Sequence, residues 1–451
     1  MPLFQRKNND PVDTIGERWM LPLIQSAHKP KKEGNCQSSG SLLLYTPPRK
    51  VVKTSAAFFI MYVALWAYCA VYPSSEMYWL NAVDKTFTRV VPRDMLMNVG
   101  LISRTQNFEK DLNVSKVLTD FIQKRERTSK EANDDEGKKR ECLDIGTPNF
   151  TKKMLWRMKH DRRPILGLLV DKTTLKLYAE ALQLKYPENI HAGGCDDIPN
   201  VEGEDGIKDF AFKASHTSSC NIIVKDGTII GHKKCLASNY IYGSLKGKKV
   251  TNALLKDQCK KWISRVYSVT EWGYQIAKPS ILMEKLIPDA IDFKCYTFDG
   301  KTDFVHVDRT NLEMRKTGRA FYDGNTFDII PTIFDIPTSH PFETPIIDSP
   351  QSDYLHKSII AKAVNLCNHI GIGLDFARID LMMMAEDSDT VTTELDNEES
   401  AITRGGDEDD FYFQVGEITL YPVSGFQIFR PGQAEVHGNN WCLPKNHGPE
   451  D

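Results

Sequence analysis

The sequence predicts an α+β fold, because strand patterns and helix patterns both occur along the chain from residue 173 onwards. Residues 377–384 and 411–420 are short apolar runs of the kind that form strands. The pair Asp299-Gly300 separates two alternating apolar runs, which is a strong hairpin signal. Residues 173–184 and 358–369 place apolar side chains on one helical face, and Asp171 can cap the first of these helices.

Length and charge limit the possible organisation. The 451 residues, 41% of them hydrophobic, can form one large domain or two ordinary ones with extensions. The net charge of −3 and the dispersed lysines and arginines exclude a nucleic-acid-binding signature.

The N-terminal part predicts a membrane anchor. Residues 1–53 are rich in Pro, Ser, Lys and Asn and are expected to form a disordered cytoplasmic tail. Residues 54–75 carry no charge over 22 positions, enough to cross a ~30 Å hydrocarbon core. Six Lys/Arg residues between Lys29 and Lys53, against three in 76–100, place the N-terminus in the cytoplasm. We therefore expect a single-pass type II signal anchor with a lumenal domain in the Golgi or secretory pathway; the alternative is a buried core helix.

A stem or linker is expected over residues 76–145, which end in a mixed-charge run. Two N-glycosylation sequons begin at Asn113 and Asn149. Eight of the ten cysteines follow residue 75, which permits disulfides without predicting their pairing. A zinc site is a weaker alternative, and its ligands would be His216, Cys220, His232 and Cys235.

Two acidic residues stand out within the apolar strands. Asp380 and Glu417 would each be costly to bury without a cation. From the two strands of a hairpin they can face the same side and hold Mg²⁺, which takes one or two carboxylates together with substrate phosphates. The alternative is a surface hairpin with solvated carboxylates. Residues 386–410, with eleven acidic residues and one basic, read as a disordered insertion between the strands.

A family resemblance rests on these strands and on motifs before them. Arg378-x-Asp380 followed by Gly416-Glu-Ile-Thr-x-Tyr-Pro-x-Ser-Gly-Phe resembles the TupA-like ATP-grasp family, associated with cell-surface polysaccharide synthesis. A Trp-containing segment, Leu169-Val-Asp-Lys172, the strand 281–287 and the Asp292-Phe-Lys hairpin precede it in the order that this family has. D-alanine:D-alanine ligase is a more distant resemblance.

The resemblance implies an ATP-grasp fold over residues 146–435, with two α+β subdomains that sandwich ATP and a C-terminal tail over 436–451. Its implied metal ligands are Asp380, Glu417 and Thr419, and Arg378 would act in catalysis. The implied nucleotide-binding residues are Lys213, Ser215, Ser218, Ser219, Lys225, Glu284, Lys285 and Lys294. The chain departs from the family in having no glycine in the loop after Lys213.

Lys213 also draws attention by itself, since a lysine inside an apolar strand needs an anion. The alternative is a hairpin with a snorkelling lysine. For 281–287 the alternative is an edge strand with its charges turned outward. Asp308, Arg309 and Arg319 are expected on the acceptor side.

The predicted function is an ATP- and Mg²⁺-dependent ligase that activates a carboxylate as an acyl phosphate and modifies a cell-surface polysaccharide or glycan precursor. Two other classes remain open. The chain layout also suits a type II membrane glycosyltransferase that uses a nucleotide sugar. The missing loop glycine suits an inactive nucleotide-binding scaffold.

Overall fold

The computed structural model describes most of the chain after residue 112, all of it within the unit Tyr62–Asp451. The predicted tail, apolar segment 54–75 and acidic insertion lie outside the described residues. Among the described residues, no helix has the length and apolar character needed to span a membrane. The described ranges are 113–134, 141–218, 220–233, 245–265, 267–268, 270–287, 290–311, 316–334, 355–385, 411–425 and 429–445.

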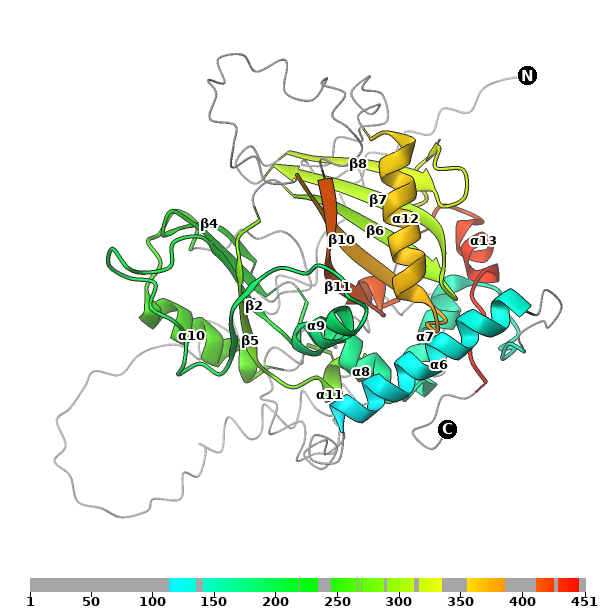
Figure 1. The fold of residues 1–451 in the computed structure, drawn as a ribbon, viewed down its shortest axis with the longest axis horizontal. Helices are drawn as coiled ribbons and strands as arrows, with labels where there is room; N and C mark the ends of the chain where they lie inside the picture. Colours follow the sequence, from blue (N-terminus) through cyan, green and yellow to red (C-terminus); the bar gives the residue numbers. More distant parts are fainter. Residues whose placement is uncertain are drawn as a thin grey trace, which may run out of the picture. The chain divides into compact units, whose positions relative to one another are not determined.

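The described part is α+β, with two antiparallel sheets (Figure 1). The smaller sheet has the order β1-β5-β2-β3-β4. Its apolar face packs on helix α10 through Phe212 and Trp262, whose ring centroids lie 5.4 Å apart. The elements are β1 Asn189–Gly193, β2 Phe210–Ala214, β3 Asn221–Lys225, β4 Thr228–Lys233, α10 Asn252–Ile263 and β5 Ile281–Lys285.

The larger sheet has the order β11-β10-β6-β7-β8-β9. Helix α12 covers its apolar face, against β6, β7 and β10 (Figure 1). The turn at Asp299-Gly300 is the predicted hairpin, with φ of 54° and 75° at its two residues. The elements are β6 Ile291–Phe298, β7 Lys301–Asn311, β8 Lys316–Asp323, β9 Ile329–Ile330, α12 Lys357–Gly371, β10 Ala377–Ala385 and β11 Phe411–Thr419.

The remaining helices pack around the larger sheet and form one core with it. In α9, Asp171 caps the N-terminus by accepting a 2.8 Å hydrogen bond from the Thr173 backbone N–H, as the sequence predicts. Leu175 and Tyr178 are buried on the predicted face of this helix. The remaining elements are α6 Val114–Asp134, α7 Phe150–His160, α8 Pro164–Val170, α9 Lys172–Ala181, α11 Trp272–Ile276, the 3₁₀ helix η3 Pro422–Gly425 and α13 Gln433–Asn439.

The globular domain extends beyond the limits 146 and 435 that the sequence predicts. Helix α6, inside the expected stem, buries Leu118 in the core, and its Arg125 donates a 2.5 Å hydrogen bond to the His369 carbonyl on α12. Trp441, in the expected C-terminal tail, is only 1% exposed. Apolar side chains beyond both limits therefore belong to the core, because burying them is favourable.

Disulfides join parts of the domain that are distant in sequence. Cys142–Cys442 ties the start of the domain to its end, Cys195–Cys259 links the segment after β1 to α10, and Cys295–Cys367 links β6 to α12. Cys220 is also disulfide-bonded, so it has no free thiolate for the zinc alternative. The described residues hold no group of three or more His, Cys, Asp or Glu residues placed to bind a metal.

The first sequon is followed by α6, whose Lys116 backbone N–H donates a 2.9 Å hydrogen bond to the Asn113 side chain. The side chain of Asn149 caps α7 and also donates a 2.7 Å hydrogen bond to Glu435. Both asparagines thus have local structural roles at helix starts.

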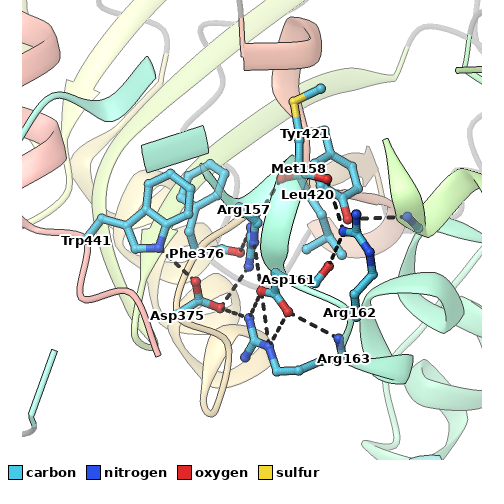
Figure 2. Close-up of polar contacts among 11 residues, drawn as sticks. Arg157, Met158, Asp161, Arg162, Arg163, Asp375, Phe376, Leu420, Tyr421 and Trp441 are labelled. Carbon is cyan, nitrogen blue, oxygen red and sulfur yellow. Dashed lines mark hydrogen bonds and ion pairs between the residues drawn. The ribbon is translucent and has the colours of Figure 1, made fainter. Parts of the chain in front are cut away.

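A buried charge network joins α7 to the large sheet (Figure 2). Asp375 accepts hydrogen bonds of 2.8 Å from Arg157, 2.6 Å from Arg163 and 2.8 Å from the Trp441 indole. Arg163 also pairs with Asp161 at 2.6 Å. The side chains of Arg157, Asp161 and Asp375 are fully buried. Burial alone would raise the pKa of Asp375, but the two arginines hold it well below its usual range.

Replacing Asp375 with alanine would remove a carboxylate that compensates the buried positive charges of Arg157 and Arg163. We expect Asp375→Ala to lower the free energy of unfolding by roughly 3–5 kcal/mol, as for other broken buried ion pairs. The matched control is Asp257→Ala, which removes a pair with Lys261 in which both side chains are more than half exposed and costs about 0.3–0.5 kcal/mol. Urea unfolding of the full chain measures both. Equal losses in the two variants would show that the network does not stabilise the fold.

Candidate active site

The face of the large sheet that packs on α12 is apolar, because neighbouring residues of a strand point to opposite faces. The opposite face carries charged side chains beside buried aromatic ones such as Tyr296 and Phe321. In β10, Ile379 and Leu381 are fully buried, whereas Arg378 and Asp380 between and beside them are partly exposed. Across the sheet, Asp380 is the direct partner of Glu417 on β11 and of Lys294 on β6. The charged face thus gathers the predicted metal and phosphate residues on three neighbouring strands.

A β-bulge turns Glu417 toward this face. Leu381 pairs with Val415 but Asp380 pairs with Glu417, so Gly416 is an extra residue in β11. In a regular strand Val415 and Glu417 would point to the same side, and Glu417 would then face the apolar core with Val415. The bulge lets Val415 stay buried while Glu417 lies opposite Asp380.

Arg378 connects the predicted ligands to one another. Its Nε and Nη2 donate hydrogen bonds of 2.7 and 2.6 Å to the two carboxylate oxygens of Asp380. Its Nη2 also donates a 2.9 Å hydrogen bond to the Thr419 hydroxyl, which itself donates to Glu417. The four residues form one hydrogen-bonded group on β10 and β11.

The two carboxylates of this group titrate differently. Burial and the charge of Glu417 raise the pKa of Asp380, against the opposing effect of Arg378. Burial would also raise the pKa of Glu417, but Lys172 and Arg378 outweigh it and lower the pKa. Neighbouring carboxylates repel each other when both are ionised. A cation between them would relieve this repulsion.

The donor set fits Mg²⁺. Asp380 and Glu417 supply carboxylate oxygens and Thr419 a hydroxyl oxygen, all hard ligands that this ion prefers. The side chains of Asp380 and Glu417 keep exposed fractions of 17% and 23%. With two carboxylates, substrate phosphates would complete the coordination.

A buried triad on the small sheet supplies positive charge. Glu284 on β5 lies 2.7 Å from Lys176 of α9 and 2.6 Å from Lys213 of β2. β5 lies between β1 and β2, so the edge-strand alternative for this segment is wrong. Burial would lower the pKa of Lys213, but Glu284 and then Glu417 on the other sheet raise it. Two lysines on one carboxylate leave a net positive charge.

Lys172 links the two sheets near the carboxylates. Its ammonium donates a 2.8 Å hydrogen bond to the Thr217 carbonyl in the loop after β2 and lies 3.9 Å from Glu417. The predicted phosphate lysine Lys294 lies 2.8 Å from Asp308 and 3.5 Å from Asp292. Burial would lower the pKa of Lys294, but these two aspartates raise it.

Lys172 and Lys176 were missed by the sequence prediction. Both belong to the start of an amphipathic helix, where a lysine is ordinarily solvated. Only Lys176 gives a signal in the sequence, because it occupies the apolar side of the predicted helix, next to Leu175 and Ala179.

Several predicted residues lie apart from this group. The Ser215 side chain is buried and donates a 3.2 Å hydrogen bond to the Lys278 carbonyl, which gives it a packing role. Lys225 is at the opposite end of β3 from Asn221, the partner of Lys213. Lys285 follows Glu284 and so points to the other face of β5.

The loop after β2 reaches the site through Ser218, which hydrogen-bonds the Tyr267 hydroxyl. Burial raises the pKa of Tyr267, and the charge of Glu417 adds to the rise. Ser219 lies outside the described residues, and so do the side chains of Arg309 and its neighbours up to residue 318.

The triad predicts a specific acid response. Burial would raise the pKa of Glu284, but Lys213 and Lys176 lower it. A lowered folded-state pKa stabilises the protein above the unfolded-state value of about 4.3, and this stabilisation is lost as the pH falls. We expect Glu284→Gln to lower the free energy of unfolding at pH 7 by roughly 3 kcal/mol and to flatten its decline between pH 5 and 3.

Urea unfolding across that pH range tests this, with the exposed Glu188→Gln as control. Parallel pH curves for the wild type and Glu284→Gln would contradict the expectation.

Comparison with known proteins found no matching family model and no matching curated protein. Among solved structures, D-alanine–D-alanine ligase from Bacillus anthracis complexed with ATP is similar at 14% identity and a TM-score of 0.30, over 65% of this chain and 72% of the ligase. The Helicobacter pylori D-alanine–D-alanine ligase is similar at 12% identity and a TM-score of 0.28, over 63% of this chain and 64% of the ligase. The ATP-grasp ligase PsnB, complexed with a precursor variant, Mg and ADP, is similar at 9% identity and a TM-score of 0.24, over 62% of this chain and 60% of PsnB.

Proposed function

We propose that this protein is an ATP- and Mg²⁺-dependent ligase that activates a carboxylate as an acyl phosphate. The observation that supports this most is the direct pairing of Asp380 with Glu417 beside Arg378, within reach of lysines from both sheets. Phosphoryl transfer requires chiefly positioning and neutralisation of charge, and this set of residues can supply both.

Each residue has a role in the proposed reaction. Lys213 and Lys294 neutralise the phosphates of ATP, and Lys172 and Lys176 add positive charge at the same place. Asp380, Glu417 and Thr419 would hold Mg²⁺, which would supply electrostatic stabilisation of the transferring phosphoryl group. Arg378 stabilises the charge that develops on the carboxylate oxygens as the acyl phosphate forms and is attacked.

We further propose that the acceptor belongs to a cell-surface polysaccharide or glycan precursor. This rests on the resemblance of the Gly416-to-Phe426 motif to the TupA-like family. A type II anchor over residues 54–75 and a lumenal domain belong to the same proposal. Three disulfides within the described domain favour an oxidising compartment.

The nucleotide site is tested by ligand-induced stabilisation of the full chain. At one hundred times its dissociation constant, Mg-ATP should add about 2.7 kcal/mol to the free energy of unfolding. We expect this gain to disappear in Asp380→Asn and Glu417→Gln and to persist in the distant Asp257→Asn. Stabilisation by a nucleotide sugar with Mn²⁺, and none by Mg-ATP, would instead identify a glycosyltransferase. Binding of Mg-ATP without turnover on any acceptor would favour the scaffold.

Two lysines among the implied nucleotide-binding residues, Lys213 and Lys225, provide a second test. Lys213 joins the buried triad, whereas Lys225 lies at the far end of β3. Loss of a hydrogen bond to a charged group costs about 1.5–3 kcal/mol. We therefore expect Lys213→Met to weaken ATP binding roughly tenfold to a hundredfold.

Lys225→Met should leave the affinity unchanged. Isothermal titration calorimetry with Mg-ATP measures both variants, and equal weakening would place the phosphates elsewhere.

A further inference from the structure

A histidine and an aspartate continue the charged face beyond Lys294. His306 on β7 is the direct partner of Lys294, which is the direct partner of Asp380. Directly opposite residues on neighbouring strands have their Cβ atoms about 4.5–5.5 Å apart. His306 therefore lies on the same face as the proposed metal ligands, two strands away from Asp380.

The position of the imidazole ring is closely defined. It is 8% exposed and stacks on Phe321, with ring centroids 4.7 Å apart and planes 11° from parallel. Its Nε2 lies 2.9 Å from Asp308 Oδ1. Asp308 is itself held by Arg319 at 2.9 Å and by Lys294 at 2.8 Å. The aspartate thus has a fixed orientation and lies against one specific nitrogen of the ring.

The charged groups that act on this ring come from three strands. Asp308 on β7 favours the imidazolium, while Lys294 on β6 and Arg319 on β8 oppose it. Burial is the largest effect, and the pKa of His306 is lowered. Nε2 is buried without a well-aligned hydrogen bond, and its 2.9 Å contact with Asp308 Oδ1 favours the neutral tautomer that carries the proton on this nitrogen. Nδ1 then holds the lone pair and can accept a proton.

We propose that His306 is the general base that accepts the proton of the attacking amine in the ligation step, with Asp308 as its positioning residue. This inference rests on the proposed function and identifies the second substrate as an amine. A buried histidine with only a packing role would explain the stacking on Phe321. The carboxylate against Nε2, on the same face as Lys294 and Asp380, adds the orienting partner that a general base requires.

The proposed step balances. The lone pair of a neutral amine attacks the carbonyl carbon of the acyl phosphate and forms a C–N bond. His306 Nδ1 takes one proton from the amine nitrogen. The C–O bond to phosphate then breaks, and the phosphate leaves with that electron pair. The imidazolium returns its proton to the departing phosphate, so that the products are an amide and hydrogen phosphate.

Two nucleophiles separate acyl-phosphate formation from base catalysis. Hydroxylamine is largely unprotonated at neutral pH and is a strong nucleophile, so it needs little help from a base. Glycinamide and methylamine are weaker nucleophiles, and their attack depends more on a base that accepts the amine proton. The full chain is assayed with ATP, Mg²⁺ and glucuronate or D-alanine as carboxylate probes, and hydroxamate, amide and ADP are measured.

We expect His306→Gln to keep hydroxamate formation within about threefold of the wild type and to lower amide formation about a hundredfold, the usual range for a lost general base. In the variant, the rate of amide formation should follow the concentration of free amine and rise about tenfold per pH unit. In the wild type, the rate should level off as the pH rises. His306→Phe keeps an aromatic ring on Phe321 and should show the same two effects. It replaces His306→Gln in the assay if that variant fails to fold.

Four results would overturn the inference. Equal losses with both nucleophiles in His306→Phe would assign His306 a packing role, and no loss with either would remove it from the reaction. Long-range ¹H–¹⁵N NMR of the wild-type ring at pH 7 should show a proton on Nε2 alone, and protonation of both nitrogens would exclude a base. Absence of ATP-dependent hydroxamate in the wild type with every carboxylate probe would overturn the proposed function itself, and this inference with it.

Discussion

The buried contact between Arg157 and Asp375 lies where the first of the two acidic strands, β10, begins and the second, β11, ends. Arg157 also donates hydrogen bonds of 3.0 and 3.2 Å to the carbonyls of Phe376 and Leu420, next to the start of β10 and the end of β11. Removing these charges from water is costly, and the contact persists because the carboxylate and the guanidinium Nη groups find several partners. One side chain of α7 thereby contacts the residues that flank both strands, at one end of the pair that carries the candidate active site.

Both sheets divide stability and chemistry between their two faces. The face packed on α10 or α12 is apolar and supplies the burial that folds the domain. The other face carries the charged groups: Lys213 and Glu284 on the small sheet, and Arg378 with its neighbouring carboxylates on the large one, where buried aromatic side chains such as Tyr296 also lie. Because the spacing between strands is fixed, cross-strand neighbours such as Asp380 and Lys294 remain in place without any ligand.

The sequence predicts the strand pair and its two acids, because the period of two and the isolated charges are local signals. It misses Lys176, whose meaning depends on Glu284 more than a hundred residues later. It also misses the bulge, although Gly416 within a strand is a recognised signal for one. The extra core segments at both ends and the disulfide pairing depend on tertiary packing, which no local pattern reveals.

The pairing at the outer end of the hairpin affects how this chain can change over time. Ala385 and Phe411 are direct partners, so β10 ends and β11 begins at the same rung of the ladder, with 25 residues between them in the sequence. That rung is five residues from Asp380, roughly 17 Å along an extended strand. Doubling the length of a flexible connection between two fixed chain ends costs only about 0.6 kcal/mol in closure entropy. The segment can therefore gain, lose or exchange residues during evolution while the spacing of the two acids stays constant.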